Sequence, residues 1–290
     1  MPIRELARAK VNLTLSVQGR RDDGYHDLVS LVAFAEIHDV VTLDPGGEDV
    51  LTVSGPFARS IDGENLLSRT LALLREADPR LRLGSVHLVK SLPVAAGIGG
   101  GSADAAALLR AVRRANEDRA GIVPWMEIAA RLGADVPMCL VNRPALVWGK
   151  GERIAPLRHL PQVDVVIVNP RLPLTTAAVF AALKSGPAPA TEAAPALPEV
   201  SELEGLLDYM QEYGNGLEPA AIGLFPQIAE IKVLLAAQAD CRFVAMSGSG
   251  PTCFGIFSTA AGARRAASAV AAARPDWWVE GTALVGAGAS

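Results

Sequence analysis

A glycine-rich segment is the part of this sequence best suited to binding a phosphate group. Residues 97–101 contain four glycines, and an alanine-rich stretch typical of a helix follows from Ala103. Glycine adopts positive φ angles and lets the backbone approach a ligand closely, because it has no Cβ. The first turn of a helix adds N–H groups without intrahelical partners and the positive end of the helix dipole. The segment therefore predicts an anion-binding loop at a helix start.

The spacing of these glycines differs from two common nucleotide-binding motifs. A P-loop needs a lysine directly after its last glycine, and none follows here. The dinucleotide fingerprint Gly-x-Gly-x-x-Gly needs a glycine where this chain has Asp104. A turn capped by Ser102 without any ligand stays an alternative, although such a turn seldom requires four glycines.

Two charged residues have the types needed to activate a hydroxyl group. Lys10 lies in an alternating stretch, residues 8–17, that predicts a strand with Lys10 and Asn12 on one polar face. Asp135 stands in Gly-Ala-Asp-Val-Pro, which is also typical of a helix start with Asp as the N-cap. If the two side chains met, the ammonium would keep the carboxylate ionised and the carboxylate could deprotonate a hydroxyl. A solvated lysine and an ordinary helix cap remain the alternatives.

Two further motifs combine groups that suit a small ligand. Residues 247–251, Ser-Gly-Ser-Gly-Pro, predict a second tight turn between two apolar strands. Tyr25 and His26 follow Gly24 and pair a flat aromatic ring with a ring that donates or accepts hydrogen bonds. Each motif also occurs as a plain turn or as ordinary surface residues, so neither decides a function alone.

The composition argues against several classes of protein. The chain of 290 residues is long enough for one large domain or two ordinary ones, and its core must consist mainly of Ala, Val and Leu because only 5% of residues are aromatic. The formal net charge is −4 and the basic residues are scattered, which argues against nucleic acid as a partner. The sequence has no apolar run of about 18 residues and no signal-peptide pattern, so we expect no membrane partner and a cytoplasmic location.

The cysteines and histidines give no sign of a zinc site or a disulfide framework. Cys139, Cys241 and Cys253 are odd in number and never at Cys-x-x-Cys spacing. No two of the four histidines have metal-ligand spacing. A zinc enzyme is therefore not expected.

The remaining pattern predicts groups of strands followed by groups of helices. Apolar runs predict further strands at residues 28–35, 40–43, 86–90, 163–168, 242–246 and 252–257. Periodicity and stop signals predict helices at residues 65–76, 103–116, 125–132, 219–239 and 260–273. This order favours an α+β fold. The proline-rich residues 185–198 are predicted as a surface loop or linker without a role in chemistry.

Taken in order, these motifs resemble those of the GHMP kinases. Residues 93–103 are similar to the central motif of that family, Pro-x-x-x-Gly-Leu-Gly-Ser-Ser-Ala. The other matching motifs lie at residues 9–13, 24–28, 133–137 and 246–252, so that the resemblance covers most of the chain. It implies a two-domain α+β GHMP kinase fold, with domains at residues 1–158 and 159–290 and the active site in the cleft between them.

The motifs are most similar to those of a family member that phosphorylates the 2-hydroxyl of 4-diphosphocytidyl-2-C-methyl-D-erythritol in the non-mevalonate isoprenoid pathway. The resemblance implies ATP and Mg²⁺ as cofactors, this small molecule as the partner, and a monomer or homodimer. A kinase for another small alcohol is the alternative within the family. A binding module that has lost catalysis is a further alternative, which the presence of both Lys10 and Asp135 opposes.

The resemblance also implies roles for individual residues. Asp135 matches the catalytic base, and Lys10 matches the lysine that orients the hydroxyl and the carboxylate. The implied ATP-binding residues are Pro93, Gly97, Ile98, Gly99, Gly100, Gly101 and Ser102, and Ser102 is also the implied metal contact. The implied substrate-binding residues are Asn12, Tyr25, His26, Thr176, Phe180 and Gly248. Tyr25, His26 and Phe180 are expected to recognise the cytosine.

The chain departs from the family pattern at four positions in the glycine-rich segment. Ala103 stands where many members have a second serine, so that hydroxyl is absent. Ala95 and Ala96 replace glycine or other small residues and are expected to stiffen the entrance of the loop. Asp104 adds a negative charge near the expected phosphate site or interacts favourably with the helix dipole.

Overall fold

The computed structural model describes residues 1–60, 65–183, 185–188 and 194–286. Its residues form two compact units, each assembled from several parts of the chain. Unit 1 contains residues 1–9, 37–94 and 99–142, and unit 2 contains residues 10–36, 95–98 and 143–290.

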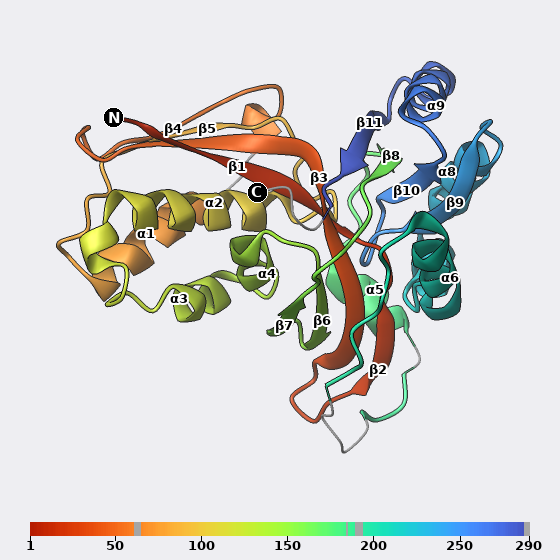
Figure 1. Cartoon of the computed structure of the whole chain (residues 1–290), viewed down its shortest axis with the longest axis horizontal. Coiled ribbons are helices and arrows are strands. Elements are labelled where there is room, and N and C mark those ends of the chain that lie inside the picture. The colour runs from red at the N-terminus through yellow and green to blue at the C-terminus, as the bar shows by residue number, and fades with distance from the viewer. Residues whose placement is uncertain (61–64, 184, 189–193, 287–290) are drawn as a thin grey trace. The chain divides into compact units, whose positions relative to one another are not determined.

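Unit 1 combines a small sheet with four helices. Its helices are α1 (Leu66–Ala77), α2 (Gly100–Ala115), α3 (Trp125–Leu132) and α4 (Val136–Val141), and its strands are β4 (Leu51–Ser54), β5 (Ser85–Val89) and parts of β1 (Ile3–Asn12) and β3 (His26–Asp44). Strand β5 pairs in antiparallel fashion with the end of β3 and in parallel with β4. Helices α1 and α2 pack against each other and lie beneath β4 and β5 in Figure 1. One-turn 3-10 helices cover Ala58–Ser60 and Glu117–Arg119.

Short-range signals explain why the helices of unit 1 form where they do. The Asn65 side chain caps α1 by accepting a hydrogen bond from the N–H of Leu67 at 3.0 Å. Leu67, Leu71 and Leu74 follow at helical spacing and are buried. Most of the buried residues of α2 are alanines, which add little bulk and so permit close packing against neighbouring helices.

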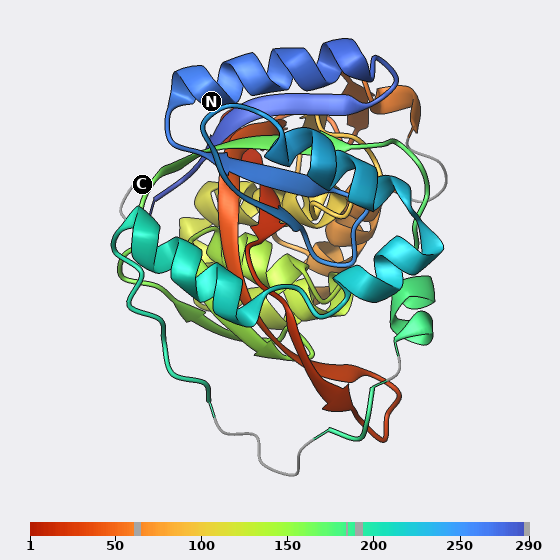
Figure 2. The ribbon, with the colours of Figure 1, turned by 90° about the vertical axis from the view of Figure 1, so that its right-hand side faces the viewer.

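Unit 2 is built on an antiparallel sheet. Its additional strands are β2 (Ser16–Arg20), β6 (Ala145–Gly149), β7 (Arg153–Pro156), β8 (Val163–Asn169), β9 (Cys241–Met246), β10 (Cys253–Phe257) and β11 (Trp278–Leu284). The strand order β3-β11-β8-β10-β9 is antiparallel throughout, and β3 joins β11 where Ala35 faces Leu284. The helices are α5 (Thr176–Ala182), α6 (Leu203–Tyr213), α7 (Glu218–Leu224), α8 (Gln227–Ala236) and α9 (Ala260–Ala273). Helix α9 lies along β11 (Figure 2).

The segment after α5 adds to the edge of the hairpin formed by β2 and β3. The N–H of Arg20 donates to the carbonyl of Gly186, and the N–H of Ala188 donates to the carbonyl of Arg20, both at 2.8 Å. Arg20 thereby forms a parallel bridge with Pro187. A Cβ on Gly19 would lie 2.4 Å from the Pro187 carbonyl oxygen, so only glycine permits this close approach. Part of the predicted loop at residues 185–198 is therefore paired with a strand, and residues 189–193 lie outside the described residues.

Apart from shifts at the ends of elements, several predicted elements are confirmed and three differ for physical reasons. The helix predicted at residues 125–132 is observed with those bounds, and so is the one at 260–273. The strand predicted at residues 8–17 stops at Asn12, because the Thr14 hydroxyl accepts from the Leu31 N–H and the Ser30 hydroxyl donates to the Thr14 carbonyl. These bonds replace regular strand pairing.

The other two differences involve Asp39 and Pro226. The strands predicted at residues 28–35 and 40–43 form one strand, β3, because the polar Asp39 between them is buried with hydrogen-bond partners. The helix predicted at residues 219–239 is two helices, α7 and α8, bent by 117° beside Pro226, whose ring cannot donate a helical hydrogen bond. Across the described residues no single helix is long and apolar enough to cross a bilayer, and the bent pair α7 and α8 meets that criterion only by length and composition.

Candidate active site

The two glycine-rich turns contact each other within unit 2. Gly97 has a φ of +73°, and a Cβ placed on it would lie 2.4 Å from the carbonyl oxygen of Gly250. The carbonyl of Ala96 accepts hydrogen bonds from the buried side chains of Asn169 and Thr252. These contacts fix residues 95–98 against the start of β10.

A polar cluster around Asn12 joins the same turn. Lys10 Nζ donates to Asn12 Oδ1 at 3.1 Å, and Asn12 Nδ2 donates to Ser30 Oγ at 2.7 Å. The Asn12 N–H donates to Ser247 Oγ at 3.0 Å. A Cβ on Gly248 would lie 3.1 Å from Asn12 Oδ1. The fold thus brings together the predicted residues Lys10, Asn12 and Gly248. The polar side chains of β1 are hydrogen-bonded within this cluster.

Lys10 is fixed at its backbone as well as at its side chain. Its N–H donates to the carbonyl of Ile98 at 2.8 Å, which ties β1 to the glycine-rich segment. Lys10 and Asn12 are each only 6% exposed. The alternative of a solvated surface lysine is therefore wrong.

The second half of the glycine-rich segment belongs to unit 1 and starts α2. This helix begins at Gly100, three residues before the predicted start, and Gly99 occupies the N-cap position with a φ of +66°. Because a glycine occupies that position, the alternative of a turn capped by Ser102 is wrong. Gly101 faces open space, and the partly exposed Ser102 side chain makes no hydrogen bond within the described part of the chain. The first-turn N–H groups have no intrahelical acceptors, as an anion site requires.

Pro93 and Asp104 complete this part of the segment. Pro93 is buried, and its carbonyl oxygen would lie 3.9 Å from a Cβ on Gly100. Asp104 is also buried, and its carboxylate forms an ion pair with Lys90 at 2.8 Å. The Asp104 carboxyl group is therefore bound to a lysine within unit 1. Ala103 is only 2% exposed, so the position of the missing serine hydroxyl lies in the interior of this unit.

Asp135 occupies the N-cap position of α4, with Pro137 in the first turn. Its side chain nevertheless makes no capping hydrogen bond, so the predicted helix start is confirmed while the carboxylate does not serve as the cap. Arg110 holds the other end of α4 by donating to the carbonyl of Cys139 at 2.8 Å. Helix α4 packs against α2 within unit 1. The relation of Asp135 to Lys10, which belongs to unit 2, stays a prediction.

Two of the residues expected at a cytosine site, His26 and Phe180, contact each other in unit 2, and the expected substrate residue Thr176 lies on the same helix as Phe180. The rings of His26 and Phe180 stack with a centroid distance of 4.8 Å, and His26 Nε2 lies 2.9 Å from Ser185 Oγ. Thr176 Oγ1 lies 2.9 Å from Ser249 Oγ, which connects the start of α5 to the second glycine-rich turn. Burial lowers the pKa of His26, with a smaller contribution from the Arg20 charge, so the neutral imidazole is favoured.

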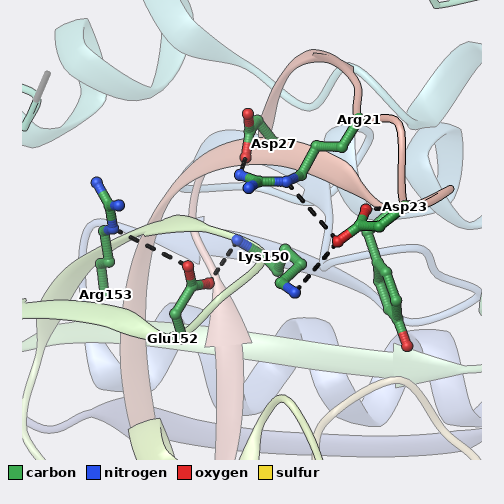
Figure 3. A network of polar contacts seen from close by, with 7 residues as sticks. Arg21, Asp23, Asp27, Lys150, Glu152 and Arg153 are labelled. Atoms are coloured by element: carbon green, nitrogen blue, oxygen red, sulfur yellow. Dashed lines mark hydrogen bonds and ion pairs between the residues drawn. The ribbon is translucent and has the colours of Figure 1, made fainter. Parts of the chain in front are cut away.

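Next to Tyr25 and His26 in the chain, Arg21, Asp23 and Asp27 form a network of ion pairs with Lys150 (Figure 3). Tyr25 is 62% exposed, and Lys150 Nζ lies 5.1 Å from the centroid of its ring. Lys150 also pairs with Asp23 at 3.3 Å, and Asp23 accepts the Tyr25 N–H at 3.0 Å. This backbone hydrogen bond, followed by the Lys150 interaction, lowers the pKa of Asp23. Arg21 pairs with Asp27 at 2.8 Å and so extends the network along the hairpin.

Sequence reasoning missed several residues that hold the glycine-rich turns. Asn215 Nδ2 donates to the carbonyls of Met246 and Gly248, each at 2.8 Å. Asn169 Nδ2 donates to Thr252 Oγ1 at 2.8 Å as well as to the loop carbonyl. Asn169 directly follows the apolar run of a predicted strand. A polar residue at the end of a buried strand was the only feature of the sequence that could have indicated its role. Asn215 carries no such signal, because its partners lie about thirty residues away.

The next question is which side chains could bind the implied Mg²⁺. Over the described ranges, no three His, Cys, Asp or Glu residues form a group that could hold a metal ion. Mg²⁺ in kinases is usually held by substrate phosphates, water and only one or two protein oxygens. The Ser102 hydroxyl, at the start of α2, is a suitable ligand of this kind.

Comparisons with known proteins decide the family. The model of the GHMP kinase N-terminal domain matches residues 65–143, and that of the GHMP kinase C-terminal region matches residues 193–276. A protein of Parvibaculum lavamentivorans, named 4-diphosphocytidyl-2-C-methyl-D-erythritol kinase, is 46% identical over 287 residues, which cover 98% of this chain and 99% of that protein. The chain belongs to the GHMP kinase family.

Solved structures agree with this assignment. A crystal structure of 4-(cytidine 5'-diphospho)-2C-methyl-D-erythritol kinase is 38% identical, with a TM-score of 0.78, and covers 98% of this chain and 100% of that one. Homoserine kinase from Cytophaga hutchinsonii, at 18% identity and a TM-score of 0.68, covers 98% of this chain and 94% of that one and shows the shared fold. The predicted family and α+β GHMP kinase fold are confirmed. As a kinase of this family, the protein uses ATP and acts on a small molecule. Both matched ranges fall inside the predicted domains 1–158 and 159–290, whose boundary stays a prediction.

Proposed function

We propose that this GHMP kinase transfers the γ-phosphoryl group of ATP to the 2-hydroxyl of 4-diphosphocytidyl-2-C-methyl-D-erythritol, giving the 2-phosphate for isoprenoid precursor synthesis in the cytoplasm. One observation of the structure carries this choice of substrate. The stacked rings of His26 and Phe180 are linked, through Thr176 and Ser249, to the turn that also holds the Lys10–Asn12 cluster. An aromatic pair connected in this way to a lysine suits an acceptor that carries both a cytosine and a reactive hydroxyl.

The glycine-rich segment is proposed to hold ATP. Backbone N–H groups of residues 97–102, flanked by Pro93, would donate to phosphate oxygens at the positive end of α2. Ser102 would hold Mg²⁺ together with the phosphates. When bound, this ion neutralises phosphate charge. Every other contact proposed here comes from the backbone of the segment.

Asp135 and Lys10 are proposed to act on the acceptor. Asp135 would take the proton of the 2-hydroxyl as its oxygen forms a bond to the γ-phosphorus and the bond from that phosphorus to the ADP oxygen breaks. The Lys10 ammonium would orient the hydroxyl, and Asn12 Oδ1 already accepts a hydrogen bond from that ammonium. Since phosphoryl transfer depends mainly on positioning, the burial of Lys10 and Asn12 supports this role.

The cytosine is proposed to bind at Tyr25, His26 and Phe180. The exposed Tyr25 ring offers a face for stacking, and the neutral His26 can donate or accept at the edge of the base. Phe180 would contact the other face of the base. Gly248 would allow the acceptor to approach Asn12, because any Cβ there would crowd the Asn12 side chain.

An ADP-release assay with a panel of acceptors tests this function. The cytidine compound is expected to support turnover, whereas homoserine and mevalonate are not. Homoserine is included because a homoserine kinase shares the fold. Faster turnover of homoserine or mevalonate would replace the proposed substrate with another small alcohol. Light scattering of the purified protein distinguishes the two expected oligomeric states, a monomer and a homodimer.

A further inference from the structure

A buried ion cluster in unit 1 lies at the start of the glycine-rich segment. Lys90 is 3% exposed, and its Nζ contacts Asp39 Oδ2 at 2.5 Å and Asp104 Oδ2 at 2.8 Å. Asp39 is fully buried, and Asp104 is 3% exposed. Burial opposes the charge of Lys90, but the carboxylates of Asp104 and Asp39 outweigh it and raise the pKa of Lys90. The lysine therefore remains a cation inside the unit.

Asp39 fixes the chain where it enters the glycine-rich segment. Its Oδ1 accepts hydrogen bonds from the N–H groups of Ser91 and Leu92, at 2.5 and 2.8 Å. The N–H of Lys90 donates to the carbonyl of Ser54 at 2.7 Å. The backbone N–H groups of the three residues before Pro93 are thus bound by two strands, by Asp39 of β3 and by Ser54 of β4.

Asp104 fixes the chain where it leaves the segment. It lies just beyond the first turn of α2, and its carboxylate is bound to the same ammonium that Asp39 holds. A Cβ on Gly100 would lie 3.2 Å from Lys90 Nζ, so the ammonium packs directly against the first turn. A single lysine therefore connects the entrance of the segment to its exit.

Stability alone does not explain this cluster. Burying charges carries a desolvation cost, and replacing buried ion pairs by apolar side chains is often neutral or stabilising. In addition, the buried Asp104 Oδ1 has no hydrogen-bond partner among the described residues. A cluster that is incompletely satisfied yet joins both flanks of one loop is better suited to positioning that loop.

We propose that Lys90, Asp39 and Asp104 are positioning residues that hold both flanks of the glycine-rich segment in the geometry that binds the phosphates of ATP. This inference rests on the proposed role of that segment in ATP binding. The three residues act through the backbone of the segment, whose N–H groups contact the phosphates. Loss of the cluster therefore weakens nucleotide binding while the acceptor site keeps its geometry.

Nucleotide binding without acceptor tests this role. Asp104→Asn and Lys90→Met are titrated with a fluorescent ATP analogue well below their melting temperatures. Each is expected to bind the analogue about tenfold more weakly, equivalent to about 1.4 kcal/mol, with KM for the acceptor within twofold of wild type. Lys90→Arg keeps the charge and is expected to recover part of the affinity. Asp104→Asn is nearly isosteric and is expected to fold. It therefore still tests the role of the cluster if Lys90→Met does not fold.

The control is an equally buried carboxylate of the same unit. Asp78 is 4% exposed, and it accepts hydrogen bonds from Arg119 and from the N–H of Arg80 at the end of α1. Asp78→Asn is expected to lower the melting temperature with nucleotide affinity unchanged. If the cluster variants behave like this control, the positioning role is overturned. A wild-type protein that binds ATP but does not phosphorylate the cytidine compound refutes the proposed function and leaves this inference standing.

Discussion

The carbonyl oxygen of Gly250 lies 2.4 Å from the point where Gly97 would carry a Cβ. Residues 153 positions apart therefore meet at backbone distance, and Gly97 has the positive φ of +73° that a side chain disfavours. The contact fixes the glycine-rich segment against the second turn.

Replacing Gly97 by alanine is expected to lower stability and nucleotide affinity together. The left-handed backbone alone costs about 1–2 kcal/mol for a residue with a Cβ, and the overlap with Gly250 adds to this. Thermal unfolding measures the effect. Gly101→Ala is the control for stability, because its Cβ would meet no atom within 4 Å and alanine favours a helix. Equal melting temperatures for the two variants would contradict the close contact.

Asp135→Asn is expected to abolish turnover and to leave folding and ATP binding nearly unchanged. The base contributes about 10²–10⁴-fold to a proton transfer. Stability should hold, because asparagine is nearly isosteric with aspartate and is equally favoured at the N-cap position that Asp135 occupies. ADP release, nucleotide titration and thermal unfolding are measured on the same sample. Near-normal turnover by this variant would remove Asp135 from the mechanism.

His26→Ala is expected to raise KM for the cytidine substrate much more than KM for ATP. The variant removes the edge contact to the base and the ring that stacks on Phe180. Tyr25→Ala should act in the same direction, since base–aromatic stacking contributes about 1–3 kcal/mol. Steady-state kinetics with each substrate varied in turn gives both constants. Equal effects on the two KM values would place His26 outside the base site.

The pKa of His26 is expected below its ordinary value of 6.5, because burial disfavours the imidazolium. The unfolded chain then binds the proton more readily than the folded one. Stability from this residue is therefore complete above pH 6.5 and falls as the pH drops from there through the lowered pKa. An NMR titration of the ring measures the midpoint. Phe180→Ala should move the midpoint upward by exposing the ring, and an unmoved midpoint would contradict the role of the stack.

Ala95→Gly is expected to raise the melting temperature slightly. Ala95 has a φ of +55°, a conformation that costs alanine about 1–2 kcal/mol, whereas the added chain entropy of glycine costs about 0.5–1 kcal/mol. Ala96→Gly is the matched control, because Ala96 is buried without a positive φ and gains no such relief. A lower melting temperature for Ala95→Gly would show that the left-handed alanine is not strained.

The sequence predicted local structure better than long-range contacts. Alternation correctly placed Lys10 and Asn12 on one face, but it did not predict that the Asn12 N–H is held by Ser247, which lies 235 positions away. Propensity placed the start of α2 at Ala103, because glycine disfavours helices, whereas Gly100 in fact begins it. Lys90 and Asp39 are 51 positions apart, so no local sequence pattern could predict that they form an ion pair. The resemblance to the GHMP kinases identified the candidate site residues. Which of these residues contact one another depends on tertiary packing.

The bridge between Arg20 and Pro187 also has a consequence for solubility. An unpaired strand edge presents hydrogen-bonding groups to other chains and is a site of aggregation. Here β2 is paired with β3 on one side, and its last residue, Arg20, is paired with residues 186–188 on the other. Pro187 has no N–H to donate, so the added segment is a poor template for a further strand. A proline in a segment predicted to be a surface loop or linker thereby makes this end of the hairpin, next to Tyr25 and His26, a poor site for pairing with another molecule.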